Sequence, residues 1–332
     1  MEANLKASTF WDGRPVLVTG CTGLLGSWLT QTLIEVGADV VGIIRDDIPQ
    51  SWLVSSGNLH RIRVAHGDVT DYALVERVIN EYEINTVFHL AAQTIVGIAN
   101  RAPLSTFDTN IRGTWFILEA IRRSPTVKRV VIASSDKAYG SQKQLPYTEE
   151  MPLQGQHPYD VSKSAADLIA QMYGKTYSLP IAITRCANLY GGGDLNWNRL
   201  IPGTIRSALQ GMQPEIRSDG TYVRDYLYVR DAVKAYLMVA ENLGRVEIKG
   251  QAFNCGTDSP MRVIDMVNLI LSLSPHPELS PRILNQVTNE IKDQYLDSTK
   301  IGTLIGWEPH YSRKQAMRET LEWYARYLDL AY

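Results

Sequence analysis

The chain is predicted to be an α/β protein with a doubly wound parallel sheet and a second, smaller mixed α/β domain. Short, almost continuously apolar runs such as 15–19 (PVLVT) and 129–133 (RVVIA) recur through the first half, separated by segments with helical spacing. Strands that are apolar on both faces are typical of parallel sheets buried between layers of helices. After about Arg185, glycines and prolines interrupt shorter elements, which indicates the smaller domain.

The expected elements alternate in the order that such a sheet requires. Strands are expected at 15–19, 39–44, 61–64, 86–90, 129–133 and 181–184. Helices are expected at 24–35, 72–82, 106–123 and 159–177. A further helix at 231–241 and a strand at 252–255 are expected to rejoin the sheet. The first domain would then comprise residues 1–185 plus about 226–256, and the second residues 186–225 and 257–332.

Composition and charge exclude several classes of protein. The 332 residues carry a formal net charge of −2 without a long run of one sign, so neither nucleic acid nor an acidic membrane surface is expected as a partner. Three scattered cysteines, Cys21, Cys186 and Cys255, predict no disulfide framework and no metal site, and favour a reducing cytoplasm. Residues 1–14 lack the apolar core of a signal peptide, and no stretch is long and apolar enough to predict a transmembrane helix.

A glycine-rich turn lies between the first expected strand and the first expected helix. Its sequence, residues 20–26, is GCTGLLG. Glycine lets the backbone turn tightly and approach a pyrophosphate, and the free N–H groups at a helix N-terminus favour an anion. A plain strand–helix turn would also use glycine, but the position favours a Rossmann-type dinucleotide site. The cofactor-binding candidates in this turn are Gly20, Thr22, Gly23, Leu24, Leu25 and Gly26.

Charged residues follow the second and third expected strands. Asp46 lies about 20 residues past the glycines, where a carboxylate takes the ribose hydroxyls of NAD. Arg45 beside it could instead pair with a 2′-phosphate, so NAD is predicted and NADP is left open. Asp68 and Val69 could lie near the adenine, although Asp68 could equally cap a helix at a surface turn.

Tyr159 and Lys163 are spaced to lie on one face of a helix. A lysine ammonium near a phenol is expected to lower the phenol pKa. The phenolate could then take a hydroxyl proton while a hydride leaves the same carbon. An exposed helical pair would have the same spacing, but the expected strand that ends in Ser134, Ser135 and Asp136 supports a catalytic pair.

Together these segments resemble the extended short-chain dehydrogenase/reductase family of NAD-dependent epimerases and dehydratases. The resemblance covers nearly the whole chain and rests on residues 19–26, 89–93, 110–114, 159 with 163, 185–191, 224–231 and 253–256. It implies a nicotinamide cofactor, a nucleotide-diphosphate-sugar substrate and a homodimer formed through a helix bundle. It also implies cofactor contacts from Leu90, Ala91, Ala92 and Asn110.

Within the family the chain is most similar to the CDP-glucose 4,6-dehydratase branch. The similarities are residues 10–14 (FWDGR), 26–29 (GSWL), 135–137 (SDK), and 191–194 (GGGD) with 199–202 (RLIP). Two segments depart from that branch. Residues 21–25 read CTGLL instead of HTGFK, and residues 224–228 read RDYLY instead of RPWQH.

The resemblance to a dehydratase implies a role for each polar residue near the pair. Tyr159, supported by Lys163, would deprotonate the C4 hydroxyl, and Ser135 would hydrogen-bond the C4 oxygen. Asp136 would protonate the departing C6 hydroxyl, and Lys137 is the candidate base at C5. The alternative for Asp136 is a polar loop residue without a catalytic role. The alternative for Lys137 is a structural salt bridge.

Arginine grips phosphate in a bidentate manner, which makes several arginines substrate candidates. The candidates for substrate binding are Gln93, Ser135, Asn188, Arg199, Leu200, Arg217 and Arg224. Of these arginines, Arg217 lies outside the family motifs. His89, on an apolar strand, is expected to be a packed core residue.

Three functions follow in order of preference. The first is a sugar-nucleotide 4,6-dehydratase that converts an NDP-glucose to a 4-keto-6-deoxy sugar and water. The second is a 4-epimerase of a UDP-sugar or UDP-uronic acid, which would need the same Tyr159 and Lys163 but no acid at Asp136. The third is a non-catalytic NAD(P)-binding regulator, which would not need the proton relay.

Overall fold

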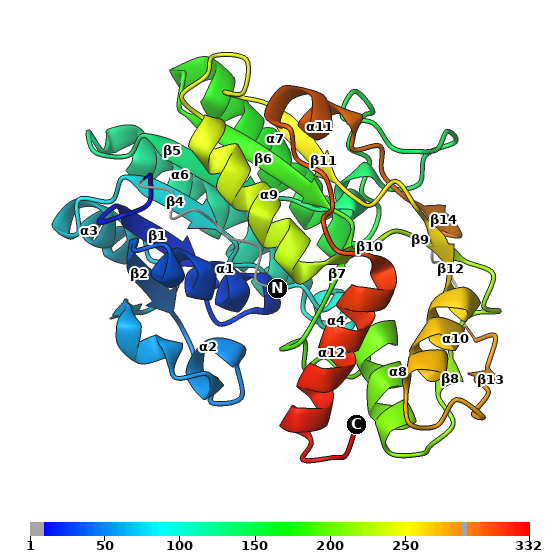
Figure 1. Cartoon of the computed structure of the whole chain (residues 1–332). Helices are drawn as coiled ribbons and strands as arrows, with labels where there is room; N and C mark the ends of the chain where they lie inside the picture. The colour runs from blue at the N-terminus through cyan, green and yellow to red at the C-terminus, as the bar shows by residue number, and fades with distance from the viewer. Residues whose placement is uncertain (1–9, 287–290) are drawn as a thin grey trace.

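The computed structural model describes residues 10–286 and 291–332. Most of residues 1–14, which are expected to contain no signal peptide, lie outside the described residues. Its centre is a seven-stranded, fully parallel sheet in the order β11-β6-β5-β4-β1-β2-β3 (Figure 1). The strands are β1 Pro15–Thr19, β2 Asp39–Ile44, β3 Arg63–His66, β4 Thr86–His89, β5 Arg129–Ala133, β6 Ile181–Cys186 and β11 Ala252–Cys255. The predicted α/β class is therefore confirmed, and the strand at 252–255 joins the sheet beside β6 as expected.

Helices cover both faces of the sheet because each face is apolar. One apolar cluster joins the sheet to α1 Leu24–Glu35, α9 Val229–Asn242 and α11 Thr299–Ile305. The other joins it to α3 Tyr72–Glu81, α6 Gly113–Arg123 and α7 Pro158–Tyr177. Strands between two such layers are buried on both sides, which explains their nearly continuous apolar sequence.

Most expected elements shift by one to three residues at an end, and two of these shifts have a clear local cause. The third strand begins at Arg63 and not at residue 61, because Asn58–Arg61 form a 3-10 turn (η1) that delays the extended backbone. The expected helix 106–123 begins at Pro103, a residue favoured in the first helical turn. It runs as α5 Pro103–Phe107, a π-helical stretch η2 Asp108–Arg112, and α6. Such π segments frequently mark functional sites.

A third apolar cluster lies beside the sheet and is built mainly from residues after 189. Helices α8 Leu200–Leu209, α10 Val263–Leu273 and α12 Arg313–Tyr327 gather around it at the lower right of Figure 1. Short strands surround them: β7 Asn188–Tyr190, β8 Glu215–Ile216, β9 Val223–Arg224, β10 Tyr226–Tyr228, β12 Met261–Arg262, β13 Arg282–Ile283 and β14 Asp293–Gln294. The proposed boundaries of two domains stay a prediction.

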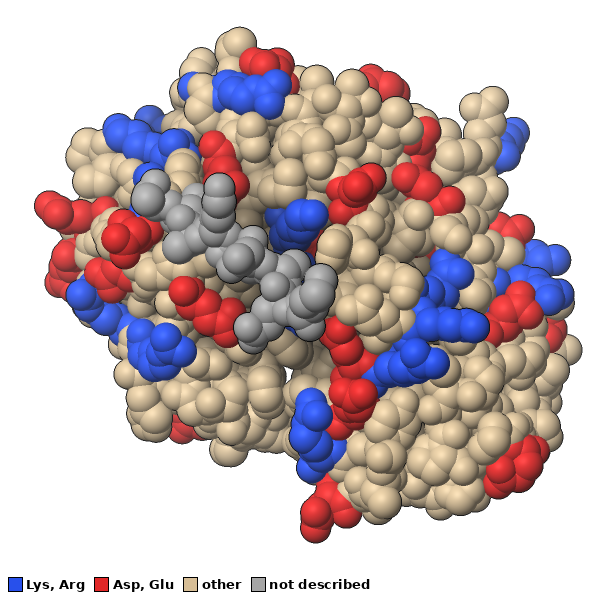
Figure 2. Space-filling view, viewed as in Figure 1, with Lys and Arg blue, Asp and Glu red and all other residues tan. Residues whose placement is uncertain are grey.

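The surface shows mixed charge. On the face in Figure 2, basic and acidic side chains are interspersed over the molecule. Within residues 10–286 and 291–332, no helix combines the length and apolarity needed to span a membrane.

Candidate active site

The candidate site lies beside β1, at the point in the sheet where the order of the strands reverses direction. The chain proceeds outward from β1 through β2 to β3, and then returns to the other side of β1 with β4. The loops at the carboxyl ends of β1 and β4 therefore diverge there, and open parallel sheets bind ligands in such crevices. The glycine turn, the residues after β4 and the residues after β5 all lie at this edge.

The glycine turn has a backbone that side chains would obstruct. Gly20 has φ +71°, and a Cβ there would lie 2.8 Å from the backbone nitrogen of Ala91. A Cβ on Gly26 would lie 2.0 Å from the carbonyl oxygen of Gly20. Helix α1 begins at Leu24 without a side-chain cap and without an acidic residue in its first turn, so its N–H groups are available to an anion. These features fit a dinucleotide pyrophosphate.

Two carboxylates surround Arg45 at the ends of β2 and β3. Its Nε lies 2.7 Å from Asp46, and its Nη1 lies 3.6 Å from Asp68. Asp68 also accepts hydrogen bonds from the backbone and side chain of Thr70, at 2.8 and 2.9 Å, whereas Asp71 caps α3. The alternative that Asp68 is the helix cap is therefore wrong. The paired arginine is a poor partner for a 2′-phosphate.

His89 fixes the end of β4, as a core residue should. It is buried, and its ring nitrogens lie 2.8 Å from Thr19 Oγ1 and 3.0 Å from Thr114 Oγ1. Burial, with a smaller effect of Lys163, lowers the pKa of His89 to about 3. Thr19 Oγ1 also accepts hydrogen bonds from the backbone of Leu90 and Ala91. The expectation of a packed histidine is confirmed.

Asn110, in the π-helical stretch, ties the next loop to α7. It accepts a hydrogen bond from the Gln93 nitrogen at 2.7 Å and donates to the Gln93 carbonyl and to Ser162 Oγ at 3.1 and 2.8 Å. Its amide is thus engaged by protein groups. Ala92 and Gln93 are partly exposed, whereas Val69 is buried against the helix at Gly113.

The structure brings Tyr159, Lys163 and Ser135 together at the ends of β5 and α7. All three are nearly buried, and Lys163 donates to the carbonyl oxygen of Ala133 at 2.8 Å. Burial raises the pKa of Tyr159 to about 12, opposed by a hydrogen bond with the Ser135 side chain, and burial lowers the pKa of Lys163 to about 8. The expectation that Lys163 lowers the phenol pKa is wrong for this arrangement, because loss of hydration outweighs the other effects on Tyr159.

Asp136 lies beside them and is only 2% exposed. Ser135 donates to its Oδ1 at 3.1 Å, while its Oδ2 is buried without a hydrogen-bond partner and lies 3.8 Å from Lys137 Nζ. Lys137 also donates to the side-chain oxygen of Gln294 on β14. No sequence pattern singled out Gln294, because Lys137 and Asp136 are 157 and 158 residues away along the chain.

The substrate candidates occupy neighbouring positions beyond this cluster. Asn188, Arg199 and Leu200 line one small cavity together with Tyr226, whose buried hydroxyl has no hydrogen-bond partner. Arg199 pairs with Asp194 at 2.5 Å. The sequence motif 224–228 contained Tyr226, but only the structure shows that its hydroxyl is unpaired.

The other two arginines differ in their surroundings. Arg224 donates to the carbonyl oxygens of Ile291 and Lys292 at 2.6 and 2.7 Å. Arg217 is exposed and donates to Asn198 at 3.2 Å, and it does not line the small cavity.

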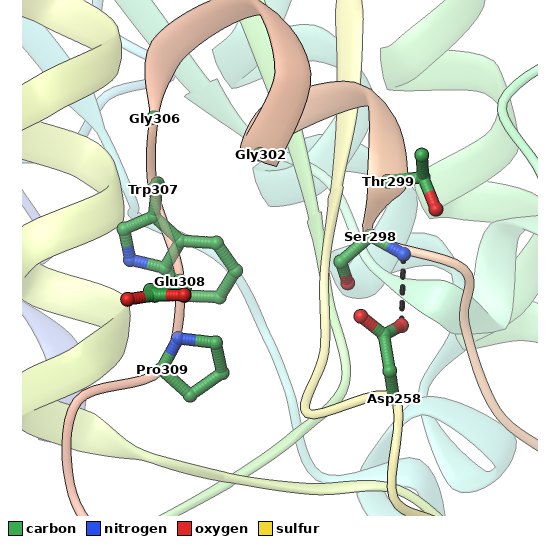
Figure 3. Close-up of a pocket in the computed structure, with 8 residues that line it drawn as sticks. All are labelled: Asp258, Ser298, Thr299, Gly302, Gly306, Trp307, Glu308 and Pro309. Atoms are coloured by element: carbon green, nitrogen blue, oxygen red, sulfur yellow. Dashed lines mark hydrogen bonds between the residues drawn. The ribbon is translucent and has the colours of Figure 1, made fainter.

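A larger, more open pocket lies elsewhere, between α11 and the loop that follows it (Figure 3). It is lined by Asp258, Ser298, Thr299, Gly302, Gly306, Trp307, Glu308 and Pro309, none of them a predicted site residue. Asp258 already accepts a hydrogen bond from the Ser298 nitrogen at 3.0 Å, and Trp307 is buried. The cluster around Tyr159 is therefore the better candidate for chemistry.

Known proteins share this arrangement over nearly the whole chain. A family model described as GDP-mannose 4,6 dehydratase matches residues 17–320. The CDP-glucose 4,6-dehydratase of Salmonella typhimurium is 30% identical over an alignment of 335 positions, which covers 96% of this chain and 92% of that protein.

Solved structures agree with the sequence comparisons. The dTDP-glucose 4,6-dehydratase of Bacillus anthracis in complex with NAD has 30% identity and a TM-score of 0.83, over 95% of this chain and 97% of that one. The UDP-glucose 4-epimerase of Thermotoga maritima with UDP-glucose has 28% identity and a TM-score of 0.85, over 95% and 99% of the two chains. The expected resemblance to epimerases and dehydratases is confirmed, and one fold serves both reactions.

Proposed function

Because the chain belongs to the GDP-mannose 4,6 dehydratase family, we propose that it is a sugar-nucleotide 4,6-dehydratase. The observation that carries the proposal is Asp136, a buried carboxyl group next to Tyr159 and Ser135, whose Oδ2 has no hydrogen-bond partner and lies 3.8 Å from Lys137 Nζ. A 4-epimerase needs no acid at that place. Elimination of water does need one, because hydroxide is a poor leaving group until it is protonated.

The first half of the reaction uses Tyr159, Ser135 and Lys163. Ser135 hydrogen-bonds the C4 oxygen, and Tyr159 takes the proton of the C4 hydroxyl. Burial raises the pKa of Tyr159 to about 12, and the hydrogen bond with Ser135 opposes that rise. In the complex with substrate, where water is displaced, the proposed role of the charged Lys163 is to favour the phenolate. The glycine turn after β1 would hold NAD, which would supply the acceptor for the C4 hydride and the donor of that hydride to C6.

The second half uses Asp136 and Lys137. The 4-keto group acidifies the proton on C5, and Lys137 removes it. The electron pair forms the C5–C6 double bond as the C6–O bond breaks. Asp136 donates a proton to the departing oxygen, which leaves as water. Lys137 returns its proton to C5 when the hydride adds to C6.

The cofactor of this proposal is NAD. The glycine turn and the open N-terminus of α1 suit its pyrophosphate, and Asp46 suits the ribose. Arg45 is paired with Asp46 and near Asp68, so a 2′-phosphate would meet two carboxylates. Tighter binding of NADP than of NAD to cofactor-free protein would contradict this choice.

The substrate of this proposal is CDP-glucose. Its support is the similarity to the Salmonella typhimurium enzyme and the Asp136-Lys137 pair. Asn188, Arg199, Leu200 and Arg224 would hold the nucleotide and its diphosphate, which assigns residues 186–225 and 257–332 to the substrate domain.

The decisive experiment incubates the purified protein with CDP-, dTDP-, UDP- and GDP-glucose and measures product mass. Loss of water from one of them, fastest with CDP-glucose, is the expected result. A product that is an isomer of the substrate, with unchanged mass, would contradict the dehydratase and support the 4-epimerase. Absence of any product from all four would contradict both.

A further inference from the structure

Gln294 contacts both residues of the Asp136-Lys137 pair. Its side chain is fully buried, its amide nitrogen donates to the Asp136 carbonyl oxygen at 3.1 Å, and its amide oxygen accepts from the Lys137 ammonium. Both ends of the amide are therefore engaged at one turn, η3 Asp136–Tyr139. A buried amide with both ends paired holds its partners in a defined geometry.

The backbone of Gln294 is fixed from the substrate side. Strand β14 pairs in parallel with β9, where Gln294 is the register partner of Arg224. Arg224 donates to the carbonyl oxygens of Ile291 and Lys292, just before β14. The segment that carries Gln294 is thus held by a residue proposed to bind the substrate diphosphate.

The surroundings of Lys137 are already acidic. Asp136 Oδ2 lies 3.8 Å away, and Asp160 on α7, itself near His157, interacts electrostatically with Lys137. A carboxylate at position 294 would add a negative charge beside Lys137 and favour the ammonium form, which cannot act as a base. A glutamine accepts the hydrogen bond without a charge.

We propose that Gln294 is a positioning residue that holds Lys137 beside Asp136 for the elimination step. The inference rests on the proposed dehydratase function. It assigns a role to a residue of β14 that touches neither Tyr159 nor Lys163 among the contacts of the described residues. Elimination should depend on Gln294, whereas oxidation at C4 should not.

The test is Gln294→Leu, which keeps the approximate volume and removes both hydrogen bonds. Turnover should fall by roughly tenfold to a hundredfold, since a misplacement of about 1 Å can cost that much. Reduction of bound NAD in a single turnover should stay within about threefold, because it uses Tyr159. Exchange of the C5 proton with deuterated water should fall with turnover.

A double variant separates positioning from a general structural role. In a Lys137→Ala background, Gln294→Leu should cause no further loss of turnover, because the group that it positions is gone. An additive loss, an equal loss in NAD reduction, or full turnover of the single variant would each overturn the inference.

A second variant keeps the test valid should Gln294→Leu fail to fold. Gln294→Glu keeps the acceptor for Lys137 and adds a charge, so the rise of turnover with pH should move to higher pH. A pH profile identical to that of the natural protein would overturn the inference. If the natural protein dehydrates no sugar nucleotide, the proposed function itself fails, which is a distinguishable result.

Discussion

At the scale of single residues, the environment of Asp136 is the most informative feature. Leaving one oxygen of a 2% exposed carboxylate without a hydrogen bond costs about 1–3 kcal/mol or more. The ion pair with Lys137 at 3.8 Å is too long for a hydrogen bond and leaves Oδ2 without a hydrogen-bond donor. A substrate hydroxyl next to Oδ2 would give it a partner, in line with a proton donor.

Asp136→Asn should lower dehydration by about 10²–10⁴-fold, the usual contribution of general acid catalysis. NAD should still be reduced when the right sugar nucleotide is added, so reduced cofactor should accumulate and be visible by its absorbance. Tyr159→Phe is the matched control, since it should abolish that absorbance change itself. Normal turnover of Asp136→Asn would make Asp136 a loop residue and favour the epimerase.

His89 should make stability depend on pH. Its pKa is about 3 in the folded protein and 6.5 without the fold, so the unfolded chain binds the extra proton first as pH falls. Stability from this group is complete above about pH 6.5 and is lost as pH falls toward 3; at pH 5 the loss is about 2 kcal/mol.

His89→Gln removes this titration, so only the natural protein should lose this stability as pH falls. The difference in unfolding free energy between the two proteins should therefore be about 2 kcal/mol smaller at pH 5 than at about pH 7.5. Chemical unfolding at both pH values measures it. Parallel pH dependence of the two proteins would contradict the assignment.

At the scale of elements, the turn between β1 and α1 depends on the absence of side chains. The carbonyl of Gly20 packs against Gly26, and Gly20 itself packs against the loop after β4. The turn is thus held between two strands and the first turn of a helix. A small change there should alter cofactor binding before it alters the rest of the fold.

Gly26→Ala should weaken NAD binding by more than about tenfold, or ~1.4 kcal/mol, because its Cβ would overlap the Gly20 carbonyl. Titration of cofactor-free protein with NAD measures the affinity. Gly244→Ala is the matched control, since no atom lies within 4 Å of a Cβ there. Equal affinities of the two variants would show that the turn is not part of the cofactor site.

At the scale of the whole molecule, α6 and α7 leave large apolar side chains uncovered. Trp115, Leu168 and Met172 are 38%, 54% and 42% exposed, whereas Leu118 on α6 packs in the chain's own core. A helix that covers a sheet needs one apolar face only. We propose that a second copy of the chain covers the outer faces of these two helices, in a two-fold dimer.

Leu168→Glu should shift a dimer toward monomer, because it would place a charge in the shared helix face. Light scattering at micromolar concentration measures the mass. Met212→Glu, at a residue 49% exposed and outside these helices, is the matched control and should keep the dimer. A natural protein that is already monomeric would refute the dimer.

Local patterns in the sequence determined the parallel sheet, most helix and strand positions, the glycine turn, and the Tyr159–Lys163 pair. Each of these depends on neighbours within a few residues, such as apolar runs or a spacing of four. The strand β11 could be assigned for the same reason.

The tertiary structure decided what depends on residues far apart in the chain. Gln294 meets Lys137 because β14 pairs with β9 and the residues after β14 pair with Tyr147. The neighbouring ends of β2 and β3 bring Asp68 to Arg45. The raised pKa of Tyr159 and the exposure of Trp115 are set by how several elements pack. Burial is a sum over the whole fold, so no local pattern contains it.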